Sequence, residues 1–318
     1  DIYQAMEAGQ IKGIWLIATN PMSSLPNTAR IRRAMEQLEF CCVQDCYHDT
    51  ESAQYAHVYL PAGTWAEKDG VMTNTERRIS RVKPVTLPPG EAKPDLWIFN
   101  RVAERFNPSG QVKFPEQAGD IFLEMGELSK GRLADISGMN HELLERNRGV
   151  QWPYTSEQAA RGEAPPKGGK RLYTVDGSFS HPDGRAKLIP LPFIDNNEVP
   201  DELFPIWLNT GRLVEHWHGR TKTGKIGNNN KFSPIPFIEI NPDLAAELGI
   251  GRGEYVRMVS RRGDALAMAQ PTQRVPKNMV FLPFHFYDCA NRLTLGLLDP
   301  HSRQPAYKQS AIRIERIA

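Results

Sequence analysis

The feature that most constrains the fold is a change of pattern along the chain, from alternating strands and helices to short strands. Near the start, residues 11–18 form an apolar run of strand type, residues 28–38 are amphipathic with helical spacing, and residues 39–45 are again strand-like. A strand, a helix and a strand in succession are typical of parallel pairing. The first part of the chain is therefore predicted to form an open parallel α/β sheet with helices on both faces.

The other elements of this part are predicted from spacing and punctuation: a helix over 2–9, a turn over 20–27, a short helix over 49–56 capped by Asp49 or Thr50, a strand over 57–62, and a helix over 93–106 that opens after Pro94. Ligands of open parallel sheets lie beyond the carboxyl ends of the strands. This rule points to Asn20, to Asp45 and to the loop over 63–82. The loop is long and charged, and is either functional or a solvated excursion.

After residue 203 the pattern changes to short strands, expected over 203–210, 236–240, 255–260, 265–271 and 279–284. A hairpin turn is expected at 261–264, and a short helix within 240–254. Residues 126–200 have a weak pattern with Pro, Gly and Lys, which indicates a linking segment. The pattern predicts a β-barrel and three segments in all: an α/β part over 1–125, a linking or wrapping segment over 126–200, and a barrel over 201–318.

Composition sets few further limits. A chain of 318 residues suits two domains. The net charge of +2 gives no reason to expect nucleic acid as a partner, and no apolar run is long enough to suggest a membrane span. The cysteines show no C-x-x-C spacing, which favours free thiols in a reducing compartment over a disulfide framework: Cys41, Cys42, Cys46 and Cys289. A metal or cluster site at residues 41–46 is the alternative, but the apolar run there favours a buried strand.

The stretch "TGRLVEHWHG", residues 210–219, places His216 and His218 two residues apart behind a Thr-Gly-Arg turn. One interpretation is a metal site, but further ligands are not evident nearby. A second is a pair of structural histidines. A third is contact with a phosphate-bearing cofactor, since Gly211 would let the backbone approach a pyrophosphate and Arg212 could pair with it through two hydrogen bonds.

Five motifs carry a resemblance, and they occur at residues 18–21, 49–82, 88–97, 210–219 and 291–308. In this order they resemble the molybdopterin-guanine-dinucleotide oxidoreductases, the family of nitrate reductases, formate dehydrogenases and dimethyl sulfoxide reductase. The resemblance implies the second half of an open parallel α/β nucleotide-binding domain, followed by a six-stranded, double-psi type barrel that binds the molybdopterin dinucleotide.

The resemblance also implies the cofactor contacts. Around a guanosine diphosphate end it places Asn20, Gln44, Asp45, Lys68 and Asp95. Along the phosphates and pterin it places Thr210, Gly211, Arg212, His216, His218, Phe284, Asn291 and Lys308. Gln44 departs from the serine often found in the family, so its contact is expected through the backbone. Phe284 has core packing as its alternative.

Other parts implied by the resemblance are not recognisable in this sequence. They are an amino-terminal segment with a [4Fe-4S] cluster and the protein ligand to molybdenum, so no catalytic residue is assigned. We therefore expect this chain, which begins with Asp1, to be a carboxy-terminal portion of a larger catalytic subunit and to be inactive alone. The remainder of that subunit is then its first partner.

The motifs most resemble those of assimilatory nitrate reductases, which implies reduction of nitrate to nitrite by oxygen-atom transfer at a bis-molybdopterin guanine dinucleotide centre. The implied partners are nitrate and an electron donor, either ferredoxin, flavodoxin or an NAD(P)H-linked subunit, and the implied location is cytoplasmic. Arginines that could steer an anion are Arg77, Arg78, Arg212 and Arg220, with surface or phosphate pairing as the alternative. A formate dehydrogenase and a non-catalytic cofactor-binding subunit remain as alternative functions.

Overall fold

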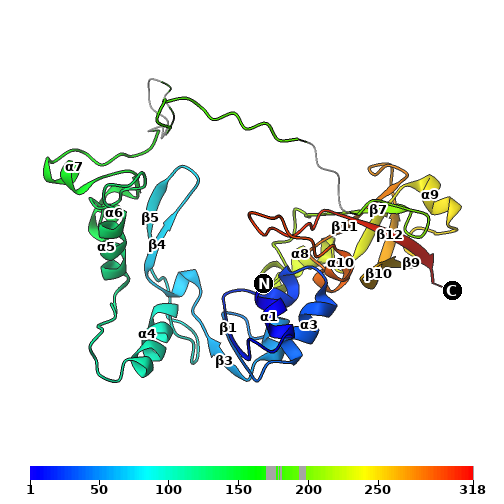
Figure 1. The fold of residues 1–318 in the computed structure, drawn as a ribbon, viewed down its shortest axis with the longest axis horizontal. Helices are drawn as coiled ribbons and strands as arrows, with labels where there is room; N and C mark the ends of the chain where they lie inside the picture. Colours follow the sequence, from blue (N-terminus) through cyan, green and yellow to red (C-terminus); the bar gives the residue numbers. More distant parts are fainter. Residues whose placement is uncertain (170–176, 178, 180, 193–197, 318) are drawn as a thin grey trace. The chain divides into compact units, whose positions relative to one another are not determined.

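The computed structural model describes residues 1–169, 177, 179, 181–192 and 198–317 (Figure 1). The chain divides into two compact units, one formed by Asp1–Tyr59 with Phe193–Ala318 and the other by Leu60–Pro192. The expected boundaries at residues 125 and 200 follow sequence pattern rather than contacts, so that division stays a prediction. Part of the expected linking segment lies outside the described residues: 170–176, 178, 180 and 193–197.

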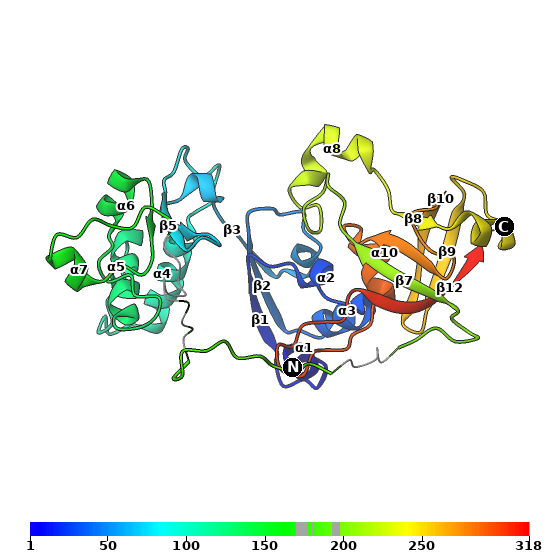
Figure 2. The same ribbon diagram turned by 90° about the horizontal axis from the view of Figure 1, so that it is seen from above.

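The first unit opens with the predicted strand, helix and strand. Its elements in order are α1 (Ile2–Glu7), β1 (Gly13–Ile17), α2 (Pro21–Ser24), α3 (Thr28–Glu36), β2 (Phe40–Asp45), the 3-10 turn η1 (Ser52–Tyr55) and β3 (Val58–Pro61). The strands form a sheet in the order β1-β2-β3, and β1 runs parallel to β2, as predicted. Helices α1 and α3 lie on one face of this sheet (Figures 1 and 2).

Apolar spacing explains this packing. Ile31, Ala34 and Met35 of α3 are buried against Leu16 of β1 and Val43 of β2, since positions three and four apart share one helix face. The turn expected over 20–27 was wrong in part, because Pro21 at the first helical position begins α2. The short helix expected over 49–56 is a 3-10 turn that starts later, after Glu51 rather than after Asp49 or Thr50.

The barrel follows in the same unit and is closed. Its strands are β7 (Ile206–Gly211), β8 (Phe237–Ile240), β9 (Tyr255–Ser260), β10 (Gly263–Pro271), β11 (Met279–Pro283) and β12 (Gln309–Arg316), in the order β10-β8-β11-β7-β12-β9. β7 pairs with β11 and β8 with β10 in parallel, and the remaining pairs are antiparallel. The expected six-stranded barrel is confirmed, although the strand pattern had not located β12.

Every second side chain along a barrel strand points inward, and these side chains fill the barrel. Leu208, Ile238, Met258, Val280 and Ile312 come from five different strands and are fully buried in one core. The helical elements that accompany the strands are η3 (Thr223–Lys225), α8 (Gly227–Phe232), α9 (Pro242–Glu247) and α10 (Tyr287–Leu293). Helix α10 contacts α2 and α3, so it joins the barrel to the α/β part of the unit.

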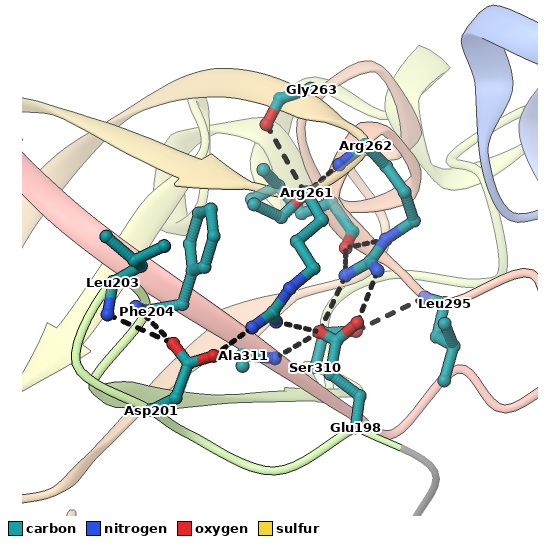
Figure 3. A network of polar contacts seen from close by, with 12 residues as sticks. Glu198, Asp201, Leu203, Phe204, Arg261, Arg262, Gly263, Leu295, Ser310 and Ala311 are labelled. Carbon is teal, nitrogen blue, oxygen red and sulfur yellow. Dashed lines mark hydrogen bonds and ion pairs between the residues drawn. The ribbon is translucent and has the colours of Figure 1, made fainter.

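A buried ion pair links the segment before β7 to the turn between β9 and β10 (Figure 3). The Glu198 carboxylate accepts hydrogen bonds from Arg262 Nη1 at 2.5 Å, from Arg262 Nη2 at 2.9 Å and from the Ala311 N–H at 2.6 Å. Arg262 also donates to the Leu293 carbonyl from Nε at 3.0 Å and from Nη2 at 2.8 Å. The expected hairpin turn between β9 and β10 is confirmed, and its Arg262 ties the segment before β7, strand β12 and the end of α10 together.

The second unit is a small sheet covered by helices. It contains η2 (Trp65–Glu67), β4 (Gly70–Thr73), β5 (Arg78–Val82), α4 (Asp95–Phe106), α5 (Ala118–Ser129), α6 (His141–Asn147), β6 (Val150–Gln151) and α7 (Ser156–Ala160). Residues 63–82 are thus not a solvated excursion, because β4 and β5 pair antiparallel and bury Ile79 against Phe122 and Leu144. The helix opening after Pro94 is confirmed.

Much of the described part of 126–200 is also folded, contrary to the expected linking segment. Asn140 caps α6 through its side chain, which accepts the Leu143 N–H, and Thr155 forms a capping box at α7. Short helices of five to seven residues carry too few turns to show a periodic pattern. Among the described residues, none of the helices has the length and apolar character needed to cross a membrane.

We predict that Glu198→Gln lowers the free energy of unfolding of the first unit by about 3 kcal/mol at pH 7, because it leaves the Arg262 guanidinium buried without its carboxylate. Both side chains are nearly buried, at 8% exposure for Glu198 and 11% for Arg262. Urea titration followed by tryptophan fluorescence measures the change. Glu247→Gln, which breaks the exposed pair with Lys277, is the control and should have little effect.

The same pair predicts a pH dependence. Burial raises the pKa of Glu198, but hydrogen bonds from Arg262 and from the Ala311 N–H outweigh it and hold the pKa below the ordinary 4.5. A carboxyl whose folded pKa is depressed stabilises the fold above its unfolded pKa and loses this contribution as pH falls. The difference between wild type and Glu198→Gln should therefore shrink below about pH 4.5, and a difference that grows there would contradict the assignment.

Candidate functional site

Two cations lie over one aromatic ring where two strands end together. β7 and β11 run parallel, with Gly211 opposite Pro283, and the Phe284 N–H donates to the Gly211 carbonyl at 3.0 Å. The Arg212 guanidinium lies 5.6 Å from the centre of the Phe284 ring and Lys308 Nζ lies 6.0 Å from it. We call Arg212, Phe284 and Lys308 the cation cluster. Within the described residues, neither cation forms an ion pair with a carboxylate, so the cluster suits an anion such as a phosphate.

Neighbouring backbone fixes this cluster. Lys308 Nζ donates to the Thr210 carbonyl at 3.3 Å, and the Thr210 hydroxyl donates to the Tyr307 carbonyl at 2.8 Å. A Cβ added at Gly211 would lie 2.3 Å from the Phe281 ring, which explains why glycine stands there. The predicted residues Thr210, Gly211, Arg212, Phe284 and Lys308 are thus brought together by the structure. For Phe284 the ring packs partly against the barrel core and also faces the two cations.

The two histidines of the motif differ in their surroundings. His216 is buried, with Nε2 at 3.1 Å from the Ser233 carbonyl and Nδ1 at 3.2 Å from the Thr223 hydroxyl. Because the carbonyl only accepts, Nε2 carries the proton in this arrangement. His216 therefore anchors the loop through both nitrogens, which fits the structural alternative, whereas His218 is exposed.

A metal site is not indicated in the part of the chain that the structure describes, where no group of three or more His, Cys, Asp or Glu side chains is placed to hold an ion. Cys41, Cys42 and Cys289 are buried free thiols, and Cys46 is exposed. Burial raises the pKa of Cys289 to about 12, so this thiol is protonated and unreactive at neutral pH.

A cavity of about 620 Å³ lies in the first unit, between the loop after β2, the loop after the histidine pair, and α10. Its walls carry three acidic and three basic side chains: Asp49, Glu51, Asp288, Arg220, Lys225 and Arg292. Lys225 forms an ion pair with Asp49. None of the predicted cofactor contacts lines the cavity, but Arg220, which the sequence offered as a candidate for steering an anion, does. Tyr287 and Arg292 were not predicted and are close in sequence to predicted positions. Proximity to His218 and Asn291 in the motifs was the available signal.

Two of the residues that line this cavity carry a buried polar atom without a partner among the described residues. In the described structure the Thr50 hydroxyl, which is 3% exposed, and Arg220 Nε are buried and make no hydrogen bond. Burial lowers the pKa of Arg220, while Arg220 Nη2 donates to Asn230 at 2.7 Å and the guanidinium stacks on Phe286. Burial and the neighbouring Glu51 both raise the pKa of Tyr287. A ligand oxygen or nitrogen would satisfy the two orphaned atoms.

Of the residues predicted to contact the cofactor at the carboxyl ends of β1 and β2, Asn20 and Asp45 form hydrogen bonds with protein groups. The Asn20 side-chain oxygen accepts from the Ser52 N–H at 3.2 Å and from the Ser52 hydroxyl at 2.6 Å, and its amide nitrogen donates to Glu51. Asn20 therefore orients Glu51 on the cavity wall. Gln44 is fully buried, and Asp45 accepts from the Tyr47 N–H at 3.1 Å.

Asn291 also has protein partners at both ends of its amide. It is buried in α10, donates to the Ser23 carbonyl at 2.6 Å, and accepts from the Thr294 hydroxyl at 3.3 Å. The Ser23 carbonyl belongs to α2, so this bond connects the two parts of the unit. Its predicted contact with the pterin stays a prediction beside this structural role.

Two predicted contacts lie in the second unit, where Lys68 and Asp95 form an ion pair with each other. Arg77 and Arg78, considered for anion steering, are engaged by the backbone. Arg77 donates to the Trp152 carbonyl at 2.5 Å, and Arg78 donates to the Arg148 carbonyl at 3.0 Å and to the Lys167 carbonyl. These bonds favour a structural role for both arginines over steering.

Comparison with known proteins agrees with the two parts of the chain. Residues 2–105 match the family model of the molybdopterin oxidoreductases, and residues 206–311 match that of the molydopterin dinucleotide binding domain. The described barrel coincides with the second match. Among solved structures, acetylene hydratase from Pelobacter acetylenicus has a similar fold, with a TM-score of 0.68, 16% identity and coverage of 99% of this chain and 46% of that one.

Relatives of two kinds are equally similar. The F420-dependent formate dehydrogenase subunit alpha of Methanocaldococcus jannaschii is 36% identical over 98% of this chain and 44% of its own length. The nitrate reductase of Synechocystis is 36% identical over 99% and 44%, and the assimilatory nitrate reductase catalytic subunit of Bacillus subtilis is 34% identical over 98% and 43%. The chain thus spans less than half the length of these relatives.

We predict that Asn291→Ala lowers the free energy of unfolding by about 1–3 kcal/mol, because the Ser23 carbonyl is left buried without its donor. The loss should appear in cofactor-free protein, since both partners of Asn291 belong to the chain. Urea titration checks this, with Asn228→Ala, at an exposed position of α8, as a control. Equal stability of the wild type and Asn291→Ala would contradict the structural role of the amide.

Proposed function

Because this chain belongs to the molybdopterin oxidoreductase family, we propose that it is the cofactor-binding portion of an enzyme that reduces nitrate to nitrite. The observation that carries the proposal is the cation cluster, whose cations have no carboxylate partner among the described residues, within a chain that is similar over 98% or more of its length to nitrate reductases. Such a cluster is suited to the pyrophosphate of a dinucleotide. The motifs at 49–82 and 88–97 further support the nitrate-reducing branch.

The side chains of the first unit fit a molybdopterin guanine dinucleotide. In this proposal Arg212 and Lys308 hold phosphate oxygens, with Phe284 as the apolar floor between them. The buried Thr50 hydroxyl and Arg220 Nε supply hydrogen bonds that the described structure leaves unused. The cavity volume lies within the range of small-molecule sites.

The remaining predicted contacts complete the proposal. Asp45, at the end of β2, is proposed to accept N–H bonds from a guanine edge, and Gln44 to contribute through its backbone. Asn20 acts by orienting Glu51. In the second unit, Lys68 and Asp95 are proposed to exchange their mutual ion pair for contacts with guanosine.

When bound, the molybdenum cofactor supplies the two-electron chemistry that converts nitrate to nitrite. The chain itself binds and orients. Its cations neutralise phosphate, and Arg220 lends a donor on the cavity wall to an oxygen of the cofactor or the substrate. We further propose that the complete enzyme binds a second pterin dinucleotide and holds a [4Fe-4S] cluster outside this chain. Its electron donor is proposed to be a ferredoxin, a flavodoxin or an NAD(P)H-linked subunit, and its location the cytoplasm.

Formate oxidation is the second candidate, and the 36% identity to a formate dehydrogenase subunit favours it. It uses the same cofactor contacts and differs at the reacting centre. A non-catalytic cofactor-binding subunit is the third. The unused donors at Thr50 and Arg220 support a ligand in all three cases.

We predict that the molybdenum-loaded protein containing this chain oxidises reduced methyl viologen when nitrate is added and releases nitrite in a 1:1 ratio to electron pairs. Viologen oxidation is followed by absorbance and nitrite by a colorimetric assay. Formate-dependent reduction of oxidised viologen without nitrate turnover would instead assign the dehydrogenase function. Inactivity with both substrates, in protein shown to contain molybdenum, would reject both enzymatic proposals.

A second prediction concerns the phosphate contact. Arg212→Ala should weaken dinucleotide binding roughly tenfold or more, since it removes a charge-assisted hydrogen bond. Guanosine monophosphate released by acid, measured per mole of protein, reports the bound cofactor. The control is Arg252→Ala, which removes another exposed arginine, one that donates to the Pro271 carbonyl. Equal cofactor content in the Arg212→Ala protein and the wild type would remove Arg212 from the site.

A further inference from the structure

His285 is a buried histidine that none of the motif assignments includes. It lies directly after Phe284 of the cation cluster, where the chain leaves β11, and is 1% exposed. Its ring centre lies 4.5 Å from that of Phe284 and 5.7 Å from that of His216. It therefore stands between the cluster and the loop that carries the histidine motif.

Both ring nitrogens of His285 bind the backbone of that loop. Nε2 accepts the Leu213 N–H at 2.8 Å, and Nδ1 donates to the His218 carbonyl at 2.6 Å. A backbone N–H only donates and a carbonyl only accepts, so the ring is neutral with its proton on Nδ1. Burial is the main cause that lowers the pKa of His285, and the charges of His216 and Arg212 lower it further.

The loop needs such an anchor. Arg212 is exposed at its start and Val214 is fully exposed, so of these first three residues only Leu213 packs against the barrel core. Fixing a residue's backbone costs about 1–2 kcal/mol of conformational entropy. Later in the loop, the Glu215 carbonyl accepts from Asn229 at 2.6 Å, and His216 and the Trp217 N–H are bound to Thr223. The Leu213 N–H at the start of the loop is bound by His285.

We propose that His285 is a positioning residue. Its two ring nitrogens bind the Leu213 N–H and the His218 carbonyl, at the two ends of the 213–218 loop, and thereby hold Arg212 over Phe284 for the cofactor phosphates. Its link to the cofactor rests on the proposed function. A neutral ring also leaves the positive charge of the site to Arg212 and Lys308. Pre-ordering the loop lowers the entropy that binding must overcome.

Hydrogen exchange of the backbone amides tests the clamp without any assay of activity. His285→Phe removes both bonds while keeping a ring, so the Leu213 amide should exchange roughly tenfold faster or more, as expected for a lost hydrogen bond. In His285→Gln the side-chain amide reaches the position of Nε2, so its oxygen can accept the Leu213 N–H and should restore protection. The matched control is His57→Phe, which removes another ring nitrogen that accepts a backbone N–H, that of Cys41, and should leave residues 212–218 unchanged.

Guanosine monophosphate content tests the link to Arg212. His285→Phe should lower the content in the wild-type background and cause no further loss in the Arg212→Ala background, because the two residues act in series. Unchanged exchange at Leu213 in His285→Phe would overturn the clamp. Equal losses of content in both backgrounds, or no loss in either, would overturn the positioning of Arg212.

Two provisions keep the outcome decisive. If His285→Phe does not fold, His285→Asn is compared with His285→Gln: the shorter amide reaches only the position of Nδ1, so Leu213 should exchange faster in the Asn variant, and equal exchange overturns the proposal. If the protein proves to bind no guanine dinucleotide, the proposed function fails, but the exchange comparison in cofactor-free protein still decides whether His285 orders the loop.

Discussion

The parallel pairing of β7 with β11 is the interaction on which the site depends. It places the ends of two strands, at Gly211 and Pro283, side by side although about 70 residues separate them in the sequence. The loops that continue from these ends therefore meet, and Arg212 faces Phe284. Closure of the barrel leaves no free strand edge there, so the position of both loops is set by the core beneath them.

Buried polar groups connect the barrel to the rest of the first unit. Arg262 joins the β9–β10 turn to Glu198 and to the end of α10, and Asn291 joins α10 to α2. These groups are costly to bury unless they are paired, so each pairing favours one arrangement of the elements. Thr50 and Arg220, which line the cavity beside α10, each keep a buried polar atom without a partner in the described structure.

Sequence reasoning succeeded where local pattern and tertiary environment agree. The buried strands and α3 have a clear period because each presents one face to a core. Sequence reasoning missed β12 and the β4–β5 hairpin, where charged side chains interrupt the alternation of apolar residues. It also missed the short helices near 141–160, which have too few turns to show a helical period. For the site, the structure brings five of the predicted contact residues together in one place, but His216 and Asn291 are engaged by protein groups, and the cavity is lined by residues near them in sequence.

The sequence by itself determined the family, through motifs of residue types at fixed spacing, and the change from an α/β pattern to a barrel of short strands; the sixth strand of the barrel was implied by the family resemblance alone. Only the tertiary structure decided which side chain in each segment is free for a ligand and which one is occupied. That choice depends on partners distant in sequence: Ser233 for His216, Ser23 for Asn291, and Leu213 with His218 for His285. No local pattern records such pairings, since a hydrogen bond depends on where the fold brings donor and acceptor together.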